Sequence, residues 1–279
     1  MRCRCPPGGP LSKWRRSFRS SCRRSRTVDP TPASVGGYLI RSVLGTGGTG
    51  TVYLARHAGG LVAVKVLDVE CPAPLVHPHI VPVYDHGATI DGKHWLAMQY
   101  VAGGDADSEL RAGRMSPARA VRIVAGVAEA LDFAHSQGVL HGDVKPSNFL
   151  LDKDDWALLT DFGVLPFVRS GTVLTSAAYA SPEMLLGNEI DGRADVYSLG
   201  CSLFRLLTGK PPFFDVGSKG AVVQAHLRRA APQATSFAPW LPTAMDDVVT
   251  RAMAKDPHER YQSARELALA ATRALATSR

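Results

Sequence analysis

Short runs of β-branched and aromatic residues, divided by glycine-rich turns, follow one another between residues 38 and 100. Runs of this length and composition are typical of strands in a small antiparallel sheet. They cover residues 38–43, 51–56, 61–67, 80–86 and 95–100. This part of the chain is therefore expected to form a sheet.

The pattern becomes helical after residue 102. Between residues 120 and 134, apolar residues recur at the spacing of one helix face. Ser116 and Pro117 precede this stretch as an N-cap and a first-turn proline, and Gly138 is expected to end it. Further helical patterns cover residues 195–208, 243–254 and 263–276.

Strands first and helices second predict an α+β protein with two lobes. The strand lobe should span about residues 36–101, and the helical lobe should span about residues 102–276. Residues 36–279 are therefore expected to form one bilobal domain.

The composition before this domain is different. Residues 1–35 are rich in Arg, Ser, Pro and Gly, and the first 26 of them hold one lysine and eight arginines without an acidic residue. These nine positive charges exceed the chain's net +7, so the remainder carries −2. So few apolar side chains cannot offset the entropy of ordering, which predicts a disordered tail. Such a tail could contact nucleic acid or anionic lipid, but we favour a solvated tail or sequence upstream of the true start codon.

The five cysteines are odd in number, and three of them lie within the first 22 residues. This arrangement is not a disulfide framework, and it favours a reducing compartment. No apolar run approaches the roughly 18–20 residues that a membrane-spanning helix needs. We therefore expect a soluble, cytoplasmic protein.

A glycine-rich segment between two expected strands is the first candidate for chemistry. It begins at Leu44, ends at Val52 and contains Gly45, Gly47, Gly48 and Gly50. Without Cβ atoms, such a backbone can approach phosphate groups closely. The pattern alone also fits a dinucleotide-binding loop or a plain flexible hairpin. A dinucleotide-binding loop should open a helix, whereas this chain continues as a strand, which disfavours that alternative.

Lys65 lies within an apolar strand 15 residues after Gly50. A buried lysine is costly unless it meets an anion, so this position favours a phosphate contact over the alternative of an outward-facing side chain. The most specific signal comes later, where residues 141–148 supply Asp143, Lys145 and Asn148, and Asp161 follows 13 positions on. In-line phosphoryl transfer needs a carboxylate beside the attacking hydroxyl, oxygen ligands for Mg²⁺ and a cation.

With these motifs, residues 38–274 resemble the eukaryotic-type protein kinases, most closely the actinobacterial serine/threonine branch. The resemblance implies a bilobal kinase fold that phosphorylates Ser or Thr of protein substrates with ATP and Mg²⁺. It implies that Asp143 is the catalytic base, with Lys145 near the terminal phosphate and Lys65 on the α- and β-phosphates. Asn148 and Asp161 would be the ligands of Mg²⁺.

The resemblance also describes the nucleotide pocket. The glycine segment would cover ATP, and residues 98–101 would form a hinge that bonds adenine through its backbone. Besides the glycines and Lys65, the residues implied to contact the nucleotide are Leu44, Val52, Ala63, Met98, Gln99 and Val101. The chain's own Thr172, Thr175 and Ser176 are candidate substrates.

Two implied contacts are structural. Glu183 should pair with Arg260, and the helix that begins near Asp195 should anchor the catalytic loop. The histidines at positions 77, 79, 86 and 94 are interpreted as structural, because no cysteine or carboxylate completes a ligand set around them.

The main departure from the family follows Lys65. Kinases place a helix there, and its glutamate pairs with the lysine. Only nine residues, 68–76, remain between the end of the strand and His77, and they include two prolines, so no regular helix fits. Glu70 is the one local acid that could replace the missing glutamate. A pseudokinase that binds nucleotide or partners without efficient catalysis is therefore the alternative to an active enzyme.

A second departure lies in the catalytic loop. Gly142 stands where most kinases have an arginine that clamps a phosphorylated residue. We therefore expect that phosphorylation at Thr172 or Thr175 cannot switch the protein through that arginine contact.

Overall fold

The computed structural model describes residues 31–47, 50–68, 74–162 and 177–277. The description below concerns the unit Pro32–Arg279. Within the described ranges, no helix is both long enough and apolar enough to cross a bilayer.

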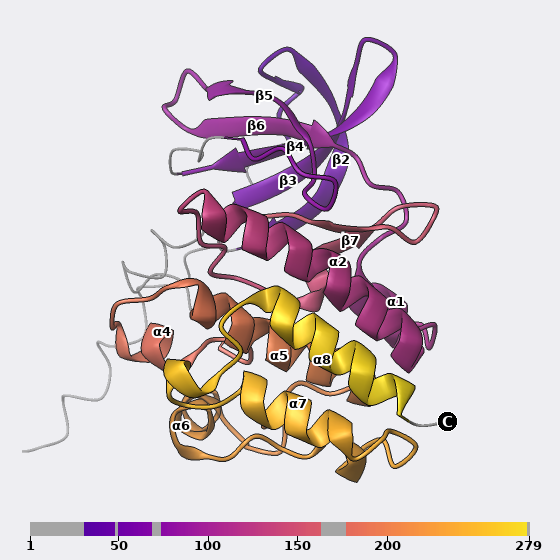
Figure 1. The fold of residues 1–279 in the computed structure, drawn as a ribbon. Helices are drawn as coiled ribbons and strands as arrows, with labels where there is room; N and C mark the ends of the chain where they lie inside the picture. Colours follow the sequence, from indigo (N-terminus) through magenta and orange to yellow (C-terminus); the bar gives the residue numbers. More distant parts are fainter. Residues whose placement is uncertain (1–30, 48–49, 69–73, 163–176, 278–279) are drawn as a thin grey trace, which may run out of the picture. The chain divides into compact units, whose positions relative to one another are not determined.

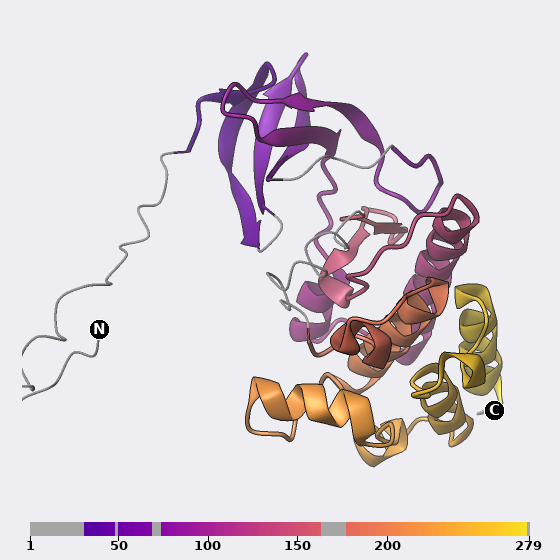
Figure 2. The same cartoon turned by 90° about the vertical axis from the view of Figure 1, so that its left-hand side faces the viewer.

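Sheet and helices form separate lobes within residues 32–279, as two perpendicular views show (Figures 1 and 2). This arrangement confirms the expected α+β, bilobal fold. The strand lobe is one antiparallel sheet in the order β1-β2-β3-β4-β6-β5. Its strands are β1 (Ser34–Val35), β2 (Tyr38–Gly47), β3 (Gly50–His57), β4 (Gly60–Leu67), β5 (Val83–Ala88) and β6 (His94–Gln99).

Two details of the sheet differ from the prediction. Ser34–Val35, which we assigned to the tail, pairs with β2 as a short strand. The strand expected over residues 80–86 begins only at Val83. Ile80 and Val81 are drawn to the helical lobe instead, where the Val81 N–H donates to the carbonyl of Leu159 at 3.0 Å.

The helical lobe contains the expected helices with small shifts of their ends. The predicted ones are α2 (Pro117–Ser136), α5 (Gly192–Thr208), α7 (Ala244–Ala252) and α8 (Ala264–Ala276). Ser116 caps α2 as predicted, because its side chain accepts a hydrogen bond from the Arg119 N–H. Helices α1 (Ala106–Arg111), α4 (Pro182–Leu186) and α6 (Lys219–Arg228) and the hairpin β7 (Phe149–Leu151)–β8 (Ala157–Leu159) were not predicted. These are short elements with little periodicity of their own.

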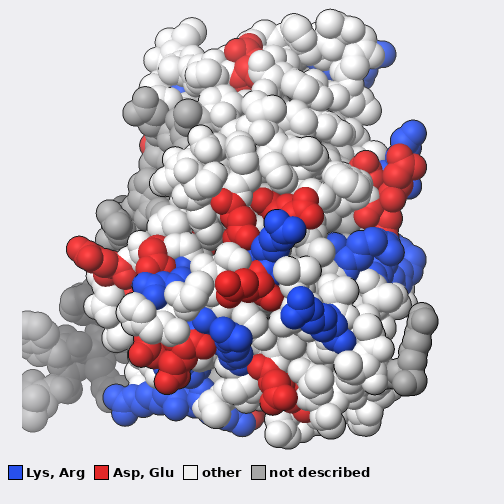
Figure 3. Space-filling view, viewed as in Figure 1, with Lys and Arg blue, Asp and Glu red and all other residues white. Residues whose placement is uncertain are grey.

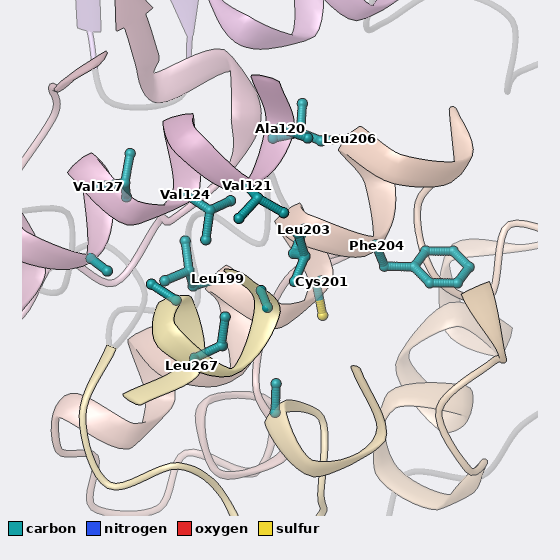
Figure 4. Packing of buried hydrophobic residues seen from close by; sticks show 14 of the residues in the cluster. Ala120, Val121, Val124, Val127, Leu199, Cys201, Leu203, Phe204, Leu206 and Leu267 are labelled. Carbon is teal, nitrogen blue, oxygen red and sulfur yellow. The ribbon is translucent and has the colours of Figure 1, made fainter. Parts of the chain in front are cut away.

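The core of the helical lobe lies where α2, α5 and α8 meet (Figure 4). Val124 and Val127 come from α2, Leu199 and Leu203 from α5, and Leu267 from α8. All five side chains are essentially inaccessible to water. Helix α5 is buried almost along its whole length, so it serves as a rigid base for the loops above it.

The segment before β5 fastens the sheet to the helical lobe. His79 stacks on Trp156 with ring centroids 4.1 Å apart, and its Nδ1 lies 2.7 Å from the Ala157 carbonyl oxygen. The indole N–H of Trp156 donates to the Pro78 carbonyl at 2.9 Å. His77 stacks on Phe133 of α2. These two histidines therefore have structural roles.

Acidic and basic side chains alternate over the helical lobe on the face shown in Figure 3, whereas the strand lobe there is largely uncharged. The mixture reflects ion pairs, such as Arg119 with Glu109 and Asp155. On this face, charges of both signs are therefore interspersed over the helical lobe.

A buried ion pair ties α4 to the end of the domain, as the sequence predicted. The Arg260 guanidinium, fully buried, donates to both carboxylate oxygens of Glu183 at 2.6 and 2.8 Å. It also donates to the carbonyls of Arg193, Ala254 and Lys255. A bidentate pair in this setting fixes α4 to the loops around α5 and α8.

We expect Glu183→Gln to lower the free energy of unfolding by about 3–5 kcal/mol, because it leaves a buried guanidinium without its counter-charge. Urea unfolding at neutral pH measures this change. The matched control is Asp215→Asn, which breaks a pair with Arg229 whose side chains are 49% and 53% exposed. In that control the free energy of unfolding should fall by at most about 1 kcal/mol. Equal losses in the two variants would contradict the assignment of Glu183–Arg260 as a stabilising buried pair.

His226 is buried between α6 and α5, where its Nδ1 lies 2.9 Å from the Tyr197 hydroxyl. Burial, together with the nearby positive charge of Lys255, lowers the pKa of His226 to about 4. In the native state His226 therefore stays neutral down to about pH 4. In the unfolded state it binds a proton already below its ordinary pKa of 6.5.

Neutral His226 therefore contributes fully to the free energy of unfolding above pH 6.5. This contribution, on the order of 3 kcal/mol, should be lost as the pH falls toward about 4. Urea unfolding of the wild type and of His226→Gln over this pH window measures the slope. The variant should be weaker at pH 7 but should lose less stability on acidification. Parallel pH profiles would show that His226 is not the group responsible.

Candidate functional site

The loop of residues 141–148 is fixed by a buried carboxylate of α5. One oxygen of Asp195 accepts the N–H of His141 at 2.9 Å, and the other accepts the N–H of Gly142 at 2.8 Å. The side chain of His135 adds a third bond to Asp195 at 2.8 Å. The expected anchoring of this loop by α5 is therefore confirmed.

Asp195 remains ionised despite its burial. Desolvation would raise its pKa, but the hydrogen bond and charge of His135 and the backbone N–H of Gly142 hold the pKa below its ordinary value. Gly142 itself adopts φ 77°, a conformation in which other residues are strained. The glycine thus lets the loop turn sharply over the Asp195 carboxylate.

Asp143 lies immediately after this turn with its neighbours arranged around it. The Lys145 ammonium donates to its Oδ2 at 2.5 Å. The Asn148 amide nitrogen donates to the Asp143 carbonyl at 2.8 Å and approaches Oδ2 at 3.4 Å. The structure therefore brings together three of the residues that the sequence singled out, with the Asp143 side chain 11% exposed.

His141 links this loop to the second acidic loop. Its Nδ1 accepts the N–H of Asp143 at 3.1 Å, which leaves Nε2 to donate to the Thr160 carbonyl at 2.8 Å. The N–H of Thr160 donates in turn to the Asn148 carbonyl at 3.1 Å. These bonds set the position of Asp161, the next residue.

Asp161 joins the helical lobe to the sheet. Its Oδ1 lies 2.9 Å from the ammonium of Lys65, whose side chain is 5% exposed. Asp161 adopts φ 70°, which is uncommon for a residue other than glycine, and such positions cluster at functional sites. Lys65 lies on β4, paired with Leu96 of β6, so the contact reaches from the middle of the sheet to the loop after β8.

The donor set of this site suits a divalent cation. Asn148 uses its amide nitrogen toward Asp143, which leaves its amide oxygen for another partner, and Asp161 provides carboxylate oxygens. Amide and carboxylate oxygens are the ligands that Mg²⁺ prefers. Among the described residues, no group of three or more His, Cys, Asp or Glu side chains forms a separate metal cluster.

An apolar cluster lies beside the charged groups and includes several residues implied to contact adenine. Ala63, Met98 and Val101 are buried in it, and Val52 packs against them. Leu150 and Leu158 complete the cluster from the hairpin β7–β8. The cluster therefore draws on both lobes.

The other implied nucleotide contacts vary in how far the structure supports them. Leu44, Gly45 and Gly47 lie on β2 and are exposed, and Gln99 ends β6 opposite Val62. Gly48 lies outside the described residues, as do Thr172, Thr175, Ser176 and Glu70. The described residues between Leu67 and His77, which are 68 and 74–76, form no helix.

Sequence reasoning assigned no role to His135 or Thr160. Both act through backbone or side-chain contacts across 19 or more residues, His135 to Asp195 and Thr160 to His141. A histidine on the polar margin of α2 and a threonine before Asp161 carry no signal in the sequence pattern. Their contribution depends on the packing of distant segments.

Comparison with known proteins agrees with this geometry. A family model described as protein kinase domain matches residues 38–270. The chain is similar to the serine/threonine-protein kinases PknJ, PknH and PknD of Mycobacterium tuberculosis, with 46%, 41% and 37% identity over 268, 265 and 280 residues. These matches cover 86%, 86% and 91% of the chain but only 45%, 42% and 42% of the relatives. The chain thus spans less than half the length of these relatives.

Gly50 provides a test of how the glycine segment is built. It adopts φ 139°, and a Cβ there would lie 2.0 Å from the carbonyl oxygen of Val66 on β4. We expect Gly50→Ala to lower the free energy of unfolding by about 1–3 kcal/mol, because both the backbone and the neighbouring strand must shift. The matched control is Gly45→Ala, whose Cβ would meet no heavy atom within 4 Å. Similar urea unfolding midpoints for the two variants would contradict this expectation.

Proposed function

The chain belongs to the protein kinase family, and on that premise we propose that it transfers the terminal phosphoryl group of ATP to serine or threonine hydroxyls of proteins. The observation that carries the proposal is the contact of Lys65 with Asp161 beside a catalytic loop in which Asp143, Lys145 and Asn148 bond one another. We also propose that the protein acts in the cytoplasm.

Asp143 is the proposed base. It accepts the proton of the substrate hydroxyl as the hydroxyl oxygen forms a bond to the terminal phosphorus, and the bond from that phosphorus to ADP breaks. Lys145, already bonded to Asp143, is placed to offset the negative charge of the moving phosphoryl group. Mg²⁺ held by Asn148 and Asp161 would neutralise charge on the phosphates.

The apolar cluster around Ala63 and Met98 is the proposed adenine surface. The other proposed nucleotide contacts are Leu44, Gly45, Gly47, Gly48, Gly50, Val52, Gln99 and Val101, of which Gly48 lies outside the described residues. Lys65 would hold the α- and β-phosphates. Lysine at position 145 is typical of kinases that act on Ser and Thr. Thr172, Thr175 and Ser176 are proposed sites of autophosphorylation.

A second candidate is a kinase-fold module that binds nucleotide without efficient transfer. It is favoured by one observation: the described residues between β4 and His77, which are 68 and 74–76, supply no carboxylate to Lys65, which is paired with Asp161. Kinases require both the lysine–glutamate pair and the aspartate–Mg²⁺ contact for activity. The two candidates differ in turnover and agree in nucleotide binding.

We expect Asp143→Asn to lower phosphoryl transfer by about 10²–10⁴-fold with little change in Mg-ATP binding, because it removes the base and preserves the shape of the site. Mass spectrometry of the chain and of a generic basic protein, after incubation with Mg-ATP, measures transfer. Thermal shift measures binding.

Lys65→Met is the matched variant that should lose nucleotide affinity as well. If wild type and both variants show only background phosphoryl transfer while Mg-ATP still shifts the melting of wild type, the binding module is favoured. No thermal shift for wild type would count against both candidates.

A further inference from the structure

Lys255 lies in a cluster of aromatic and titratable groups that the proposed reaction does not use. It follows α7, and its ammonium donates to the Tyr197 hydroxyl at 3.3 Å. The same ammonium lies 5.5 Å from the centroid of the Tyr197 ring and 5.2 Å from the centroid of the Phe213 ring. Both rings are buried, whereas Lys255 keeps part of its surface open to solvent. The rings therefore replace much of the water around this charged group.

A second positive charge shares the Tyr197 ring. The guanidinium carbon of Arg260 lies 4.9 Å from the centroid of that ring, and one of the Arg260 N–H groups donates to the backbone carbonyl of Lys255 at 3.1 Å. Arginine stays protonated in proteins, and its two bonds to Glu183 offset only part of its charge. Protonation of Lys255 thus places two cations beside one aromatic ring.

These surroundings favour the neutral amine of Lys255. A lysine that loses its water and lies beside another cation gives up its proton more readily than a lysine in water. The attraction of the ring faces for the ammonium opposes this change but is the smaller influence. Burial, with the charge of Arg260 adding to it, lowers the pKa of Lys255 to about 8.

The other titratable groups around the amine carry no charge at neutral pH. Burial raises the pKa of the Tyr197 hydroxyl and of the Cys201 thiol, and it lowers the pKa of His226 to about 4. Because the Tyr197 oxygen accepts from Lys255, its proton is directed to the Nδ1 of His226, 2.9 Å away. A neutral Lys255 thus donates one N–H to Tyr197 and keeps its lone pair for an electrophile.

We propose that Lys255 is a site of acylation by small acyl thioesters near neutral pH. The amine nitrogen attacks the carbonyl carbon of the thioester, so that a C–N bond forms and the C–S bond breaks. The nitrogen loses one proton, and the departing sulfur takes up a proton and leaves as the thiol. The product is a neutral amide, which removes the positive charge beside Tyr197. This inference does not depend on phosphoryl transfer.

Acylation is tested with acetyl-coenzyme A and the full chain at pH 7.5, by peptide mapping with mass spectrometry over time. About a quarter of an amine with a pKa near 8 is neutral at this pH, against about 0.1% of an ordinary lysine. The less basic amine is also the weaker nucleophile, so we expect Lys255 to react about tenfold faster than the exposed Lys153 and Lys219. In urea this difference should disappear, because it depends on the fold.

The pH profile distinguishes a shifted amine from one that is merely accessible. Acetylation of Lys255 should level off above about pH 9, whereas acetylation of Lys153 and Lys219 should keep rising. Lys255→Arg should remove the modified peptide and leave the two exposed lysines unchanged. Reaction of Lys255 no faster than that of the exposed lysines, or a parallel rise of all three with pH, would overturn the proposal.

A second measurement needs no acyl donor. Reductive methylation with ¹³C-formaldehyde labels the lysines, and Lys255→Arg identifies the signal of Lys255 in the NMR spectrum. That signal should titrate near pH 8. Titration above about pH 10, as for a lysine in water, would contradict the proposal whatever the rate of acetylation.

Discussion

Lys65 holds a charged ammonium in the middle of the sheet, on a strand that is otherwise apolar and buried. A charge in such a place is tolerated when a counter-charge lies within bonding distance. In this chain the counter-charge is Asp161, which belongs to the other lobe. One electrostatic requirement therefore draws the two lobes together at the point where the chemistry is proposed.

The supports of Asp161 can be followed back into the helical core. Asp161 follows Thr160, whose carbonyl accepts from His141, and the N–H of His141 is bonded to the carboxylate of Asp195. Asp195 lies on α5, which is packed on several sides by α2, α7 and α8. A rigid, buried helix thus sets the positions of groups at the surface of the lobe, and the precision of the site derives from core packing.

The described residues between β4 and His77 supply no carboxylate to Lys65 in place of the glutamate that kinases usually have there. The consequences are local. The segment before β5 is fastened to the helical lobe by the stacking of His79 on Trp156 and by backbone hydrogen bonds of His79 and Val81 with Leu159. These contacts come from described residues after His77, so the junction of the lobes on this side does not depend on the segment that follows β4.

The sequence by itself determined the fold class, the main strands and helices, and the pairing of Glu183 with Arg260. It also singled out Asp143, Lys145 and Asn148, which the structure brings together. These features depend on local periodicity, on capping residues such as Ser116, or on motifs whose residues are close together in the chain. The sequence also indicated that no regular helix fits between Lys65 and His77, since nine residues with two prolines are too few.

Tertiary structure alone decided which carboxylate pairs with Lys65, how His135 and Thr160 support the site, and that the segment of Ile80 and Val81 pairs with Leu159 of β8 and not with the sheet. It also revealed the short elements α1, α4 and α6, which local propensity cannot specify. Each of these outcomes depends on contacts between groups that are far apart in the chain. The distances between those groups are fixed only when the whole core is packed.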